Sequence, residues 1–173
     1  MNPLKNPAGA RISGQTAGVT AMTEEPELSA PVAFNELMDA FGFADFSSGE
    51  NRAYIDPRTG RIYVVSDLDD PDDPIEETPD DLEESDVYIA LPDRRDLDLR
   101  RPLALSFVDE ALPDQWKTAV EIFNRKGAYG RFKALLARHD VLEAWYAYEA
   151  AATERALRDW CAENAIALHE AVT

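Results

Sequence analysis

Basic and aromatic side chains alternate in one short stretch of this chain, between residues 125 and 138. The stretch contains no acidic residue, and its basic residues are Arg125, Lys126, Arg131, Lys133 and Arg138. Basic groups pair with phosphates, and aromatic rings stack on nucleic-acid bases. The stretch therefore predicts a binding surface, which we assign to Arg125, Lys126, Gly127, Tyr129, Arg131 and Lys133.

Two glycines, Gly127 and Gly130, punctuate this stretch. They favour a tight turn between two helices, or a close approach of backbone amides to a phosphate at the start of the second helix. A phosphate-binding loop has Gly, four residues, and then Gly-Lys followed by Ser or Thr. Because this spacing is missing, we favour the structural turn.

The residues that commonly do catalysis are few and scattered. Cys161 follows Trp160 in a predicted helix, which favours a buried and inert thiol. His139 and His169 have no neighbouring serine or cysteine, and a lone cysteine with two distant histidines has no metal-ligand spacing. We expect no catalytic residue, no metal site and no cofactor, and we keep an enzyme of unknown type as a third hypothesis.

The acidity of the chain is concentrated in one segment. The formal charge is −17, and residues 67–86 contain twelve acidic residues and no basic one. Repulsion between these charges, together with Pro71, Pro74 and Pro79, opposes helix formation and predicts a mobile, solvated acidic loop. A calcium site is disfavoured because the spacing lacks the glycine and the terminal glutamate of an EF-hand loop.

The ends of the chain give few structural signals. Residues 1–28 are small and polar without an apolar period, which predicts a disordered tail, and Met22 is a possible alternative start. No apolar run approaches the ~18 to 20 residues that span a membrane, and no secretory apolar block is present. With the single cysteine, these features favour a cytoplasmic protein that does not contact a membrane.

A β-hairpin is the clearest local prediction. Residues 54–56 and 61–65, which are rich in Tyr, Ile and Val, flank Pro57-Arg58-Thr59-Gly60, in which proline and glycine suit their turn positions. Residues 87–91 are predicted as a third strand that ends at Pro92.

Helical periods account for most of the remaining chain. Phe34, Leu37, Met38 and Phe41 form one apolar face of a helix that we expect to end at Gly42, with Ser29 as its N-cap. Further helices are predicted from Pro102 and Asp114 and around Phe132, with apolar faces at Leu105, Val108, Ala111 and Leu112 and at Trp116, Ala119, Val120 and Phe123. A long final helix is predicted from Asp140, which forms a capping box with Glu143, to Asn164, with Trp145 and Trp160 as core anchors.

The predicted fold class is α+β, with a small antiparallel sheet of about three strands packed on a helical C-terminal half. We expect a single domain over residues 29–168 with the acidic loop 67–86, and short tails at 1–28 and 169–173.

Several motifs occur in an order that resembles a known family. They are Tyr54–Gly60, Tyr88–Pro92, Gly127–Lys133, Glu143–Tyr146 and Asp159–Asn164. Together they resemble the bacterial uncharacterised protein family 0158 over about residues 29–168. Relative to that family, Tyr129 stands at a Phe, Gly130 at an Arg and Ala165 at a closing Gly. The resemblance implies the order of the elements and no activity.

The charge layout leads to two further hypotheses about function. The favoured one is a non-catalytic, cytoplasmic interaction or regulatory module, in which loop 67–86 meets a basic surface of an unknown protein partner or the chain's own 125–138 stretch. The alternative is binding of RNA or single-stranded nucleic acid through 125–138, which the acidic loop opposes by repulsion.

Overall fold

The predicted hairpin forms the centre of a small sheet. The computed structural model describes residues 30–46, 51–66 and 78–170. In it, β2 (Asn51–Ile55) pairs antiparallel with β3 (Ile62–Ser66), and the amide of Gly60 donates to the carbonyl of Asp56 at 2.8 Å. Gly60 has φ +73°, and a Cβ there would lie 2.5 Å from the carbonyl oxygen of Pro31. Only glycine fits this turn.

The third strand lies on the other side of β2. β4 (Ile89–Ala90) pairs antiparallel with β2, so the strand order is β3-β2-β4. The paired part is shorter than the predicted 87–91, although the amide of Leu91 still donates to the carbonyl of Ala53 at 2.9 Å. The described residues form five α-helices, mostly in the C-terminal half, so the α+β fold class is confirmed.

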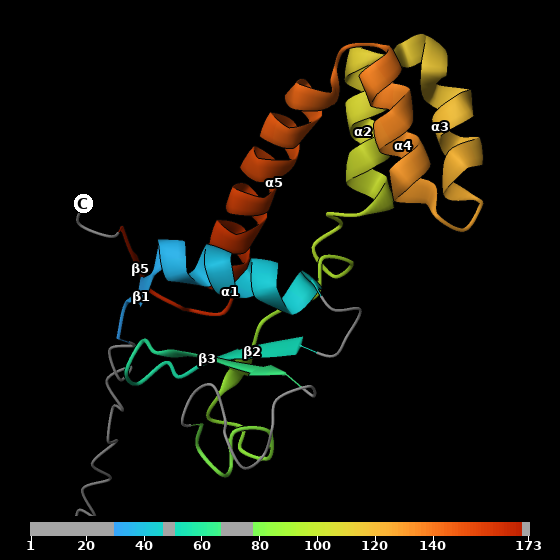
Figure 1. Ribbon diagram of the computed structural model, residues 1–173. Helices are drawn as coiled ribbons and strands as arrows, with labels where there is room; N and C mark the ends of the chain where they lie inside the picture. Colours follow the sequence, from blue (N-terminus) through green and yellow to red (C-terminus); the bar gives the residue numbers. More distant parts are fainter. Residues whose placement is uncertain (1–29, 47–50, 67–77, 171–173) are drawn as a thin grey trace, which may run out of the picture.

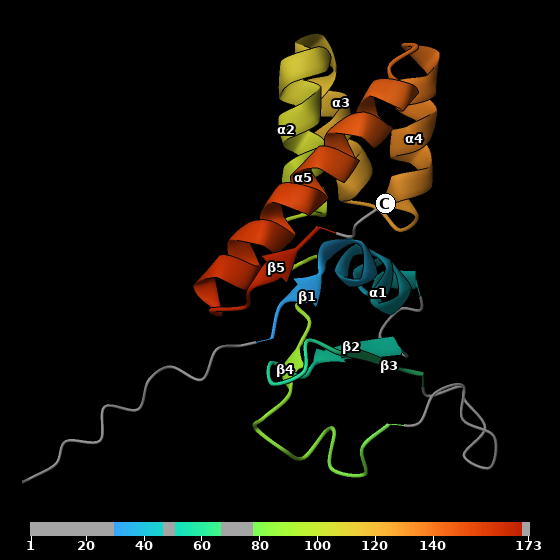
Figure 2. The ribbon, with the colours of Figure 1, turned by 90° about the vertical axis from the view of Figure 1, so that its left-hand side faces the viewer.

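Helix α1 (Phe34–Phe46) lies between the sheet and the end of the last helix (Figures 1 and 2). It buries Phe34, Leu37 and Phe41 against Ile55, as the apolar period predicts. The predicted end at Gly42 is wrong. Gly42 does not have a positive φ, so it stays inside the helix at a cost of roughly 1 kcal/mol relative to alanine.

The remaining helices form a bundle: α2 (Arg101–Ala111), the short helix η1 (Pro113–Gln115), α3 (Trp116–Phe123), α4 (Ala128–Arg138) and α5 (Leu142–Glu163). The bundle core is built around Trp145, which makes edge contacts with Phe107 at 5.4 Å and Phe132 at 5.1 Å between ring centroids. Trp145 is only 1% exposed, so its predicted role as a core anchor is confirmed.

Helix α5 joins two separate cores. Its first half places Trp145 in the bundle core, and its second half places Leu157 and Cys161 in the sheet core, where they join Phe41 and Ile55. Trp160 is partly buried against the same sheet core. A single helix therefore connects the sheet and α1 to the bundle, as Figure 1 shows.

Two predicted helix faces need correction. In α2 the buried residues are Ala104, Phe107 and Val108, while Ala111 is exposed. In α3 only Ala119 is buried, and Trp116 is 43% exposed. Trp116 is the first residue of an eight-residue helix, so it is not part of a continuous buried face.

The junction before α5 also differs from the prediction. Asp140 has φ +56°, and the amide of Val141 donates to the carbonyl of Leu136 at 3.1 Å. These are features of a Schellman motif that ends α4. The residue before α5 is Val141, without a side-chain cap bond, so the Asp140–Glu143 capping box is wrong. Aspartate is favoured both as a helix N-cap and as a residue in the left-handed region. Asp140 takes the left-handed conformation here.

The two ends of the described chain meet. β1 (Val32–Ala33) pairs in parallel with β5 (Leu168–His169), which the sequence analysis did not predict. His169 was placed at the start of the C-terminal tail and pairs here with Ala33. Residues 1–29, including the predicted disordered tail and the Ser29 cap, lie outside the described residues, as do residues 171–173.

The described part of the acidic segment contacts the outer face of the sheet. Residues 67–77 lie outside the described residues, while 78–86 form turns. Leu82 is 4% exposed, and Glu83 bonds Arg52 of β2 at 2.9 Å. Just beyond the segment, Tyr88 meets Tyr63 edge-on at 6.0 Å. The prediction of a solvated loop is therefore wrong at Leu82, whose side chain is buried.

Candidate anion-binding site

The predicted site residues surround the turn between α3 and α4 without converging on one point. Gly127 takes φ +70° at the start of α4, so the turn predicted there is present. Tyr129 is partly buried and meets Phe123 edge-on at 5.3 Å. The Nζ of Lys133 lies 5.3 Å from the ring centroid of Tyr146 on α5. The side chains of Arg125, Lys126 and Arg131 are exposed.

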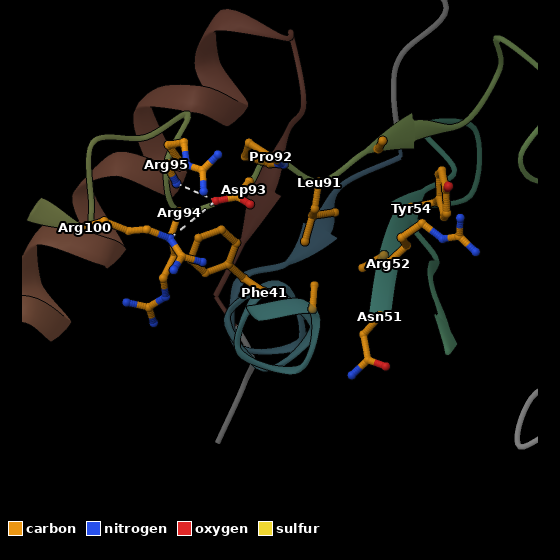
Figure 3. A pocket seen from close by; sticks show the side chains of 13 residues that line it. Phe41, Asn51, Arg52, Tyr54, Leu91, Pro92, Asp93, Arg94, Arg95 and Arg100 are labelled. Atoms are coloured by element: carbon orange, nitrogen blue, oxygen red, sulfur yellow. Dashed lines mark hydrogen bonds and ion pairs between the residues drawn. The ribbon is translucent and has the colours of Figure 1, made fainter. Parts of the chain in front are cut away.

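A different set of basic residues lines a hollow between α1, β2 and the segment that follows β4. The hollow has a volume of about 520 Å³, and Figure 3 shows it from close by. Arg52 and Tyr54 lie on β2 at one side, with their side chains directed away from Phe41, and arginines of the segment after β4 lie on the other side, with Phe41 and Leu91 between the two. We call this the larger hollow, and its arginines are Arg52, Arg94, Arg95 and Arg100.

Local hydrogen bonds hold the segment that carries three of these arginines. A carboxylate oxygen of Asp93 accepts from the amide of Arg95 at 2.6 Å. Asp98 takes φ +55°, and the amide of Leu99 donates to the carbonyl of Arg94 at 2.8 Å. Leu99 is 4% exposed and anchors the turn in the sheet core. The segment therefore presents its arginines from a fixed turn.

Three arginines of the larger hollow already have carboxylate partners. Arg94 lies 3.3 Å from Glu149 on α5 and 5.5 Å from the ring centroid of Phe41. Arg100 lies 3.7 Å from Asp93, and Arg52 pairs with Glu83. In each of these contacts one guanidinium nitrogen faces one carboxylate oxygen, so carboxylates are the groups that already pair with arginines here.

A smaller hollow of about 330 Å³ adjoins the larger one. Arg95 and Arg100 line both hollows, and Arg101 lines the smaller one together with Phe123 and Tyr129. Among the described residues, neither the Arg95 nor the Arg101 guanidinium forms an ion pair. Tyr129 is therefore the predicted site residue that the fold brings next to arginines with available charge.

The comparisons with known proteins identify a family. The model of the uncharacterised protein family UPF0158 matches residues 29–171, which is most of the chain. The chain belongs to this family. The resemblance noted from the motifs is thereby confirmed. No curated protein and no solved structure shows a significant match to the chain.

One departure from the UPF0158 pattern has a structural meaning. Ala165, where the motif resemblance implies a closing glycine, has φ +56°. The amide of Ile166 donates to the carbonyl of Cys161 at 2.8 Å, which completes a Schellman motif at the end of α5. Asn164 was predicted to close this helix, and its side-chain amide donates to the carbonyl of Trp160 at 2.8 Å.

Two other titratable groups of this UPF0158 member, Cys161 and Asp56, are held by burial or by hydrogen bonds within the fold. Cys161 is fully buried, and burial raises the pKa of its thiol to about 11, which keeps the thiol protonated and unreactive. Hydrogen bonds from Arg58 lower the pKa of the Asp56 carboxyl in the hairpin turn. In the described ranges, no three His, Cys, Asp or Glu side chains gather as metal ligands.

The sequence analysis missed the arginine site. Arg94-Arg95 and Arg100-Arg101 are two arginine doublets with residues 96–99 between them. This pairing of doublets is a sequence signal that could have indicated a basic site. The interleaved Asp93, Asp96 and Asp98 offset the charge of these arginines in the sequence, which conceals the site. Within the parts of the chain that the structure describes, no helix is long and apolar enough to cross a membrane.

Proposed function

We propose that this protein is a non-catalytic interaction module that binds an acidic segment of another protein in the two arginine-lined hollows. The observation that carries the proposal is that five arginines line the two hollows of a chain with a net charge of −17: Arg52, Arg94, Arg95, Arg100 and Arg101. Arginine is enriched at protein interfaces, because its planar fork binds carboxylates at two points.

Carboxylates as ligands are supported by the contacts already present. Glu149, Asp93 and Glu83 each bind one arginine of the larger hollow. Arg95 and Arg101 are exposed, and neither guanidinium has an ion pair among the described residues. An incoming carboxylate would therefore meet two available guanidinium groups without first breaking an internal pair.

The acidic segment of the chain is the second charged feature of the module. Its described part meets Arg52 rather than the 125–138 stretch. Contact of the remaining acidic residues, 67–77, with a basic surface of a partner or with residues 125–138 stays a prediction. We place the module in the cytoplasm as part of the same proposal.

The experiment is a titration of the full chain with a fluorescently labelled acidic peptide, followed by anisotropy at low and moderate salt. The double variant Arg95→Gln and Arg101→Gln should weaken binding by at least tenfold, since charged hydrogen bonds contribute about 1.5–3 kcal/mol each. The matched control is Arg155→Gln, an exposed arginine on α5 that lines neither hollow. Equal affinity of the double variant and the wild type would refute the proposal.

Single-stranded nucleic acid is a second candidate ligand. It is favoured by the rings of Phe123 and Tyr129 beside Arg101 in the smaller hollow, and by the exposed side chains of Arg125 and Lys126 nearby in sequence. Reversing both charges, with Arg125→Glu and Lys126→Glu, should flatten the salt dependence of oligonucleotide binding. The acidic-peptide proposal expects these two changes to leave peptide affinity within about twofold, because rim charges contribute little.

A further inference from the structure

The small sheet is covered on the face that points away from α1 as well as on the face that packs against it. Ile55 of β2 is buried in the core beside α1, and alternation along the strand places Arg52 and Tyr54 on the opposite, outer face. Tyr63 of β3 is paired directly with Tyr54, so its side chain lies on the same outer face. Tyr63 is only 8% exposed, which requires a cover on this face.

Residues 78–86 belong to that cover. Figures 1 and 2 show the segment that leads into β4 on the side of β2 and β3 away from α1. The carboxylate of Glu83 lies 2.9 Å from the guanidinium of Arg52. The neighbouring Leu82 is only 4% exposed, so its side chain is buried where the segment meets the sheet. An aliphatic side chain and the carboxylate that follows it therefore make the contact together.

Backbone hydrogen bonds give this segment its shape. The amide of Leu82 donates to the carbonyl of Pro79 at 3.1 Å, and the amide of Ser85 donates to the carbonyl of Asp81 at 3.0 Å. These are turns, and residues 78–86 contain no helix or strand. The segment can therefore leave the outer face without breaking the pairing of β2 with β3.

The ion pair in this contact is of an exchangeable kind. The side chains of Arg52 and Glu83 are 42% and 48% exposed, so water and salt screen their attraction. Burial of the single side chain of Leu82 adds the apolar part of the contact. When the segment leaves, an apolar seat is exposed next to the guanidinium of Arg52.

From this arrangement we infer that the outer face of the sheet docks an acidic peptide of a partner protein, in which an aliphatic residue directly precedes a glutamate, and that residues 78–86 occupy the face as an internal ligand. The inference goes beyond the proposed function, because it uses Arg52 on the outer face and neither Arg95 nor Arg101. The chain's own Leu82 and Glu83 show the chemistry that this face accepts.

The internal ligand also sets how the partner binds. A tethered segment acts at an effective concentration on the order of millimolar, so it competes strongly with a peptide that arrives from solution. The partner therefore binds weakly while residues 78–86 are docked and tightly once they have been displaced.

The test first removes binding in the hollows. All titrations use the full chain with Arg95→Gln and Arg101→Gln, which we call the background chain, and a fluorescently labelled peptide that copies residues 78–86. Both arginines are exposed, and thermal melting verifies that the background chain is folded. Binding of the peptide to this chain then reports on the outer face.

Weakening the internal contact should strengthen binding of the peptide. Leu82→Ala together with Glu83→Gln in the background chain should raise the affinity at least about tenfold, because both parts of the internal contact are lost. Adding Arg52→Gln should remove most of this gain. Equal affinity with and without the Leu82 and Glu83 changes, or no binding in either case, would overturn the inference.

Two single variants carry the test if the Leu82 change prevents folding. Glu83→Gln in the background chain removes only an exposed carboxylate and should raise the affinity roughly threefold. Glu84→Gln, at the exposed neighbouring position, should leave the affinity unchanged. An equal effect of the two substitutions would show that net charge alone matters, which would contradict a specific contact of Glu83 with Arg52.

A second peptide tests the apolar seat. It has the same composition, with the leucine moved to the first position, so that length and charge are unchanged. This peptide should bind the chain with Leu82→Ala and Glu83→Gln at least about fivefold more weakly, because its leucine no longer precedes a glutamate. If the two peptides bind equally, the outer face does not recognise the aliphatic residue and the inference is wrong.

The remaining outcomes separate this surface from the hollows. Binding of the 78–86 peptide that requires Arg95 and Arg101 but is indifferent to Arg52→Gln would place the peptide in the hollows, so the outer-face inference would be wrong while the proposed function stands. Tighter binding of a single-stranded oligonucleotide than of the peptide, lost on Arg52→Gln, would assign the outer face to nucleic acid and would also overturn the inference.

Discussion

The guanidinium of Arg94 lies 3.3 Å from the carboxylate of Glu149. This contact joins the turn before α2 to the middle of α5, across fifty-five positions of sequence. Arg94 also lies over the ring of Phe41, at 5.5 Å from its centroid. One side chain therefore contacts both α1 and α5 at the wall of the larger hollow.

Breaking this contact should destabilise the protein. Glu149→Gln removes the charge that faces a guanidinium only 20% exposed, so we expect a loss of about 1–2 kcal/mol in the free energy of unfolding. Urea denaturation measures it. The control is Glu121→Gln on the exposed face of α3, which should change stability by less than about 0.5 kcal/mol. A similar loss in both variants would contradict a specific role for the pair.

The end of α5 offers a stabilising substitution. Ala165 has φ +56°, a conformation that costs a residue with a Cβ roughly 1 kcal/mol or more. Ala165→Gly should therefore raise the free energy of unfolding by about 0.5–1 kcal/mol and the melting temperature by a few degrees. The same change at Ala162, an exposed position inside the helix, should lower stability by a similar amount. Two losses of equal size would show that the left-handed conformation is not present in solution.

Burial of Cys161 predicts a pH dependence at the alkaline end. The pKa of its thiol is raised from 9.0 to about 11 in the folded chain. Between these values the unfolded chain loses the proton and the native chain keeps it, so stability should fall as the pH rises from about 9 to 11. Cys161→Ala should remove this part of the decline, as followed by urea denaturation at several pH values. An unchanged slope would show that the native thiol ionises normally.

Local patterns account for the elements that the sequence predicted well. The Asp56–Gly60 turn was predictable because proline and glycine restrict its geometry within a few residues. The buried face of α4, with Phe132, Leu135 and Leu136, follows from helical spacing alone. Trp145 was assigned to the core on the same grounds.

The candidate site depends on contacts that no local pattern encodes. Arg52, Arg95 and Tyr129 lie far apart in the chain, and only the packing of β2 and the bundle around the 92–100 turn brings them to adjoining hollows. Asp140 shows the limit of local signals at a helix end, because aspartate suits both an N-cap and a left-handed position. The pairing of β1 with β5 joins two-residue strands that are too short for a period.

Hydrogen exchange of the full chain, with and without an acidic peptide at saturating concentration, tests the central claim most directly. Binding in the hollows predicts slower amide exchange in residues 51–54 and 92–101, with exchange in the middle of α5 unchanged. Protection confined to residues 124–127, or no protection at any amide under conditions in which the peptide binds, would contradict the assignment of the arginine-lined hollows as the binding site.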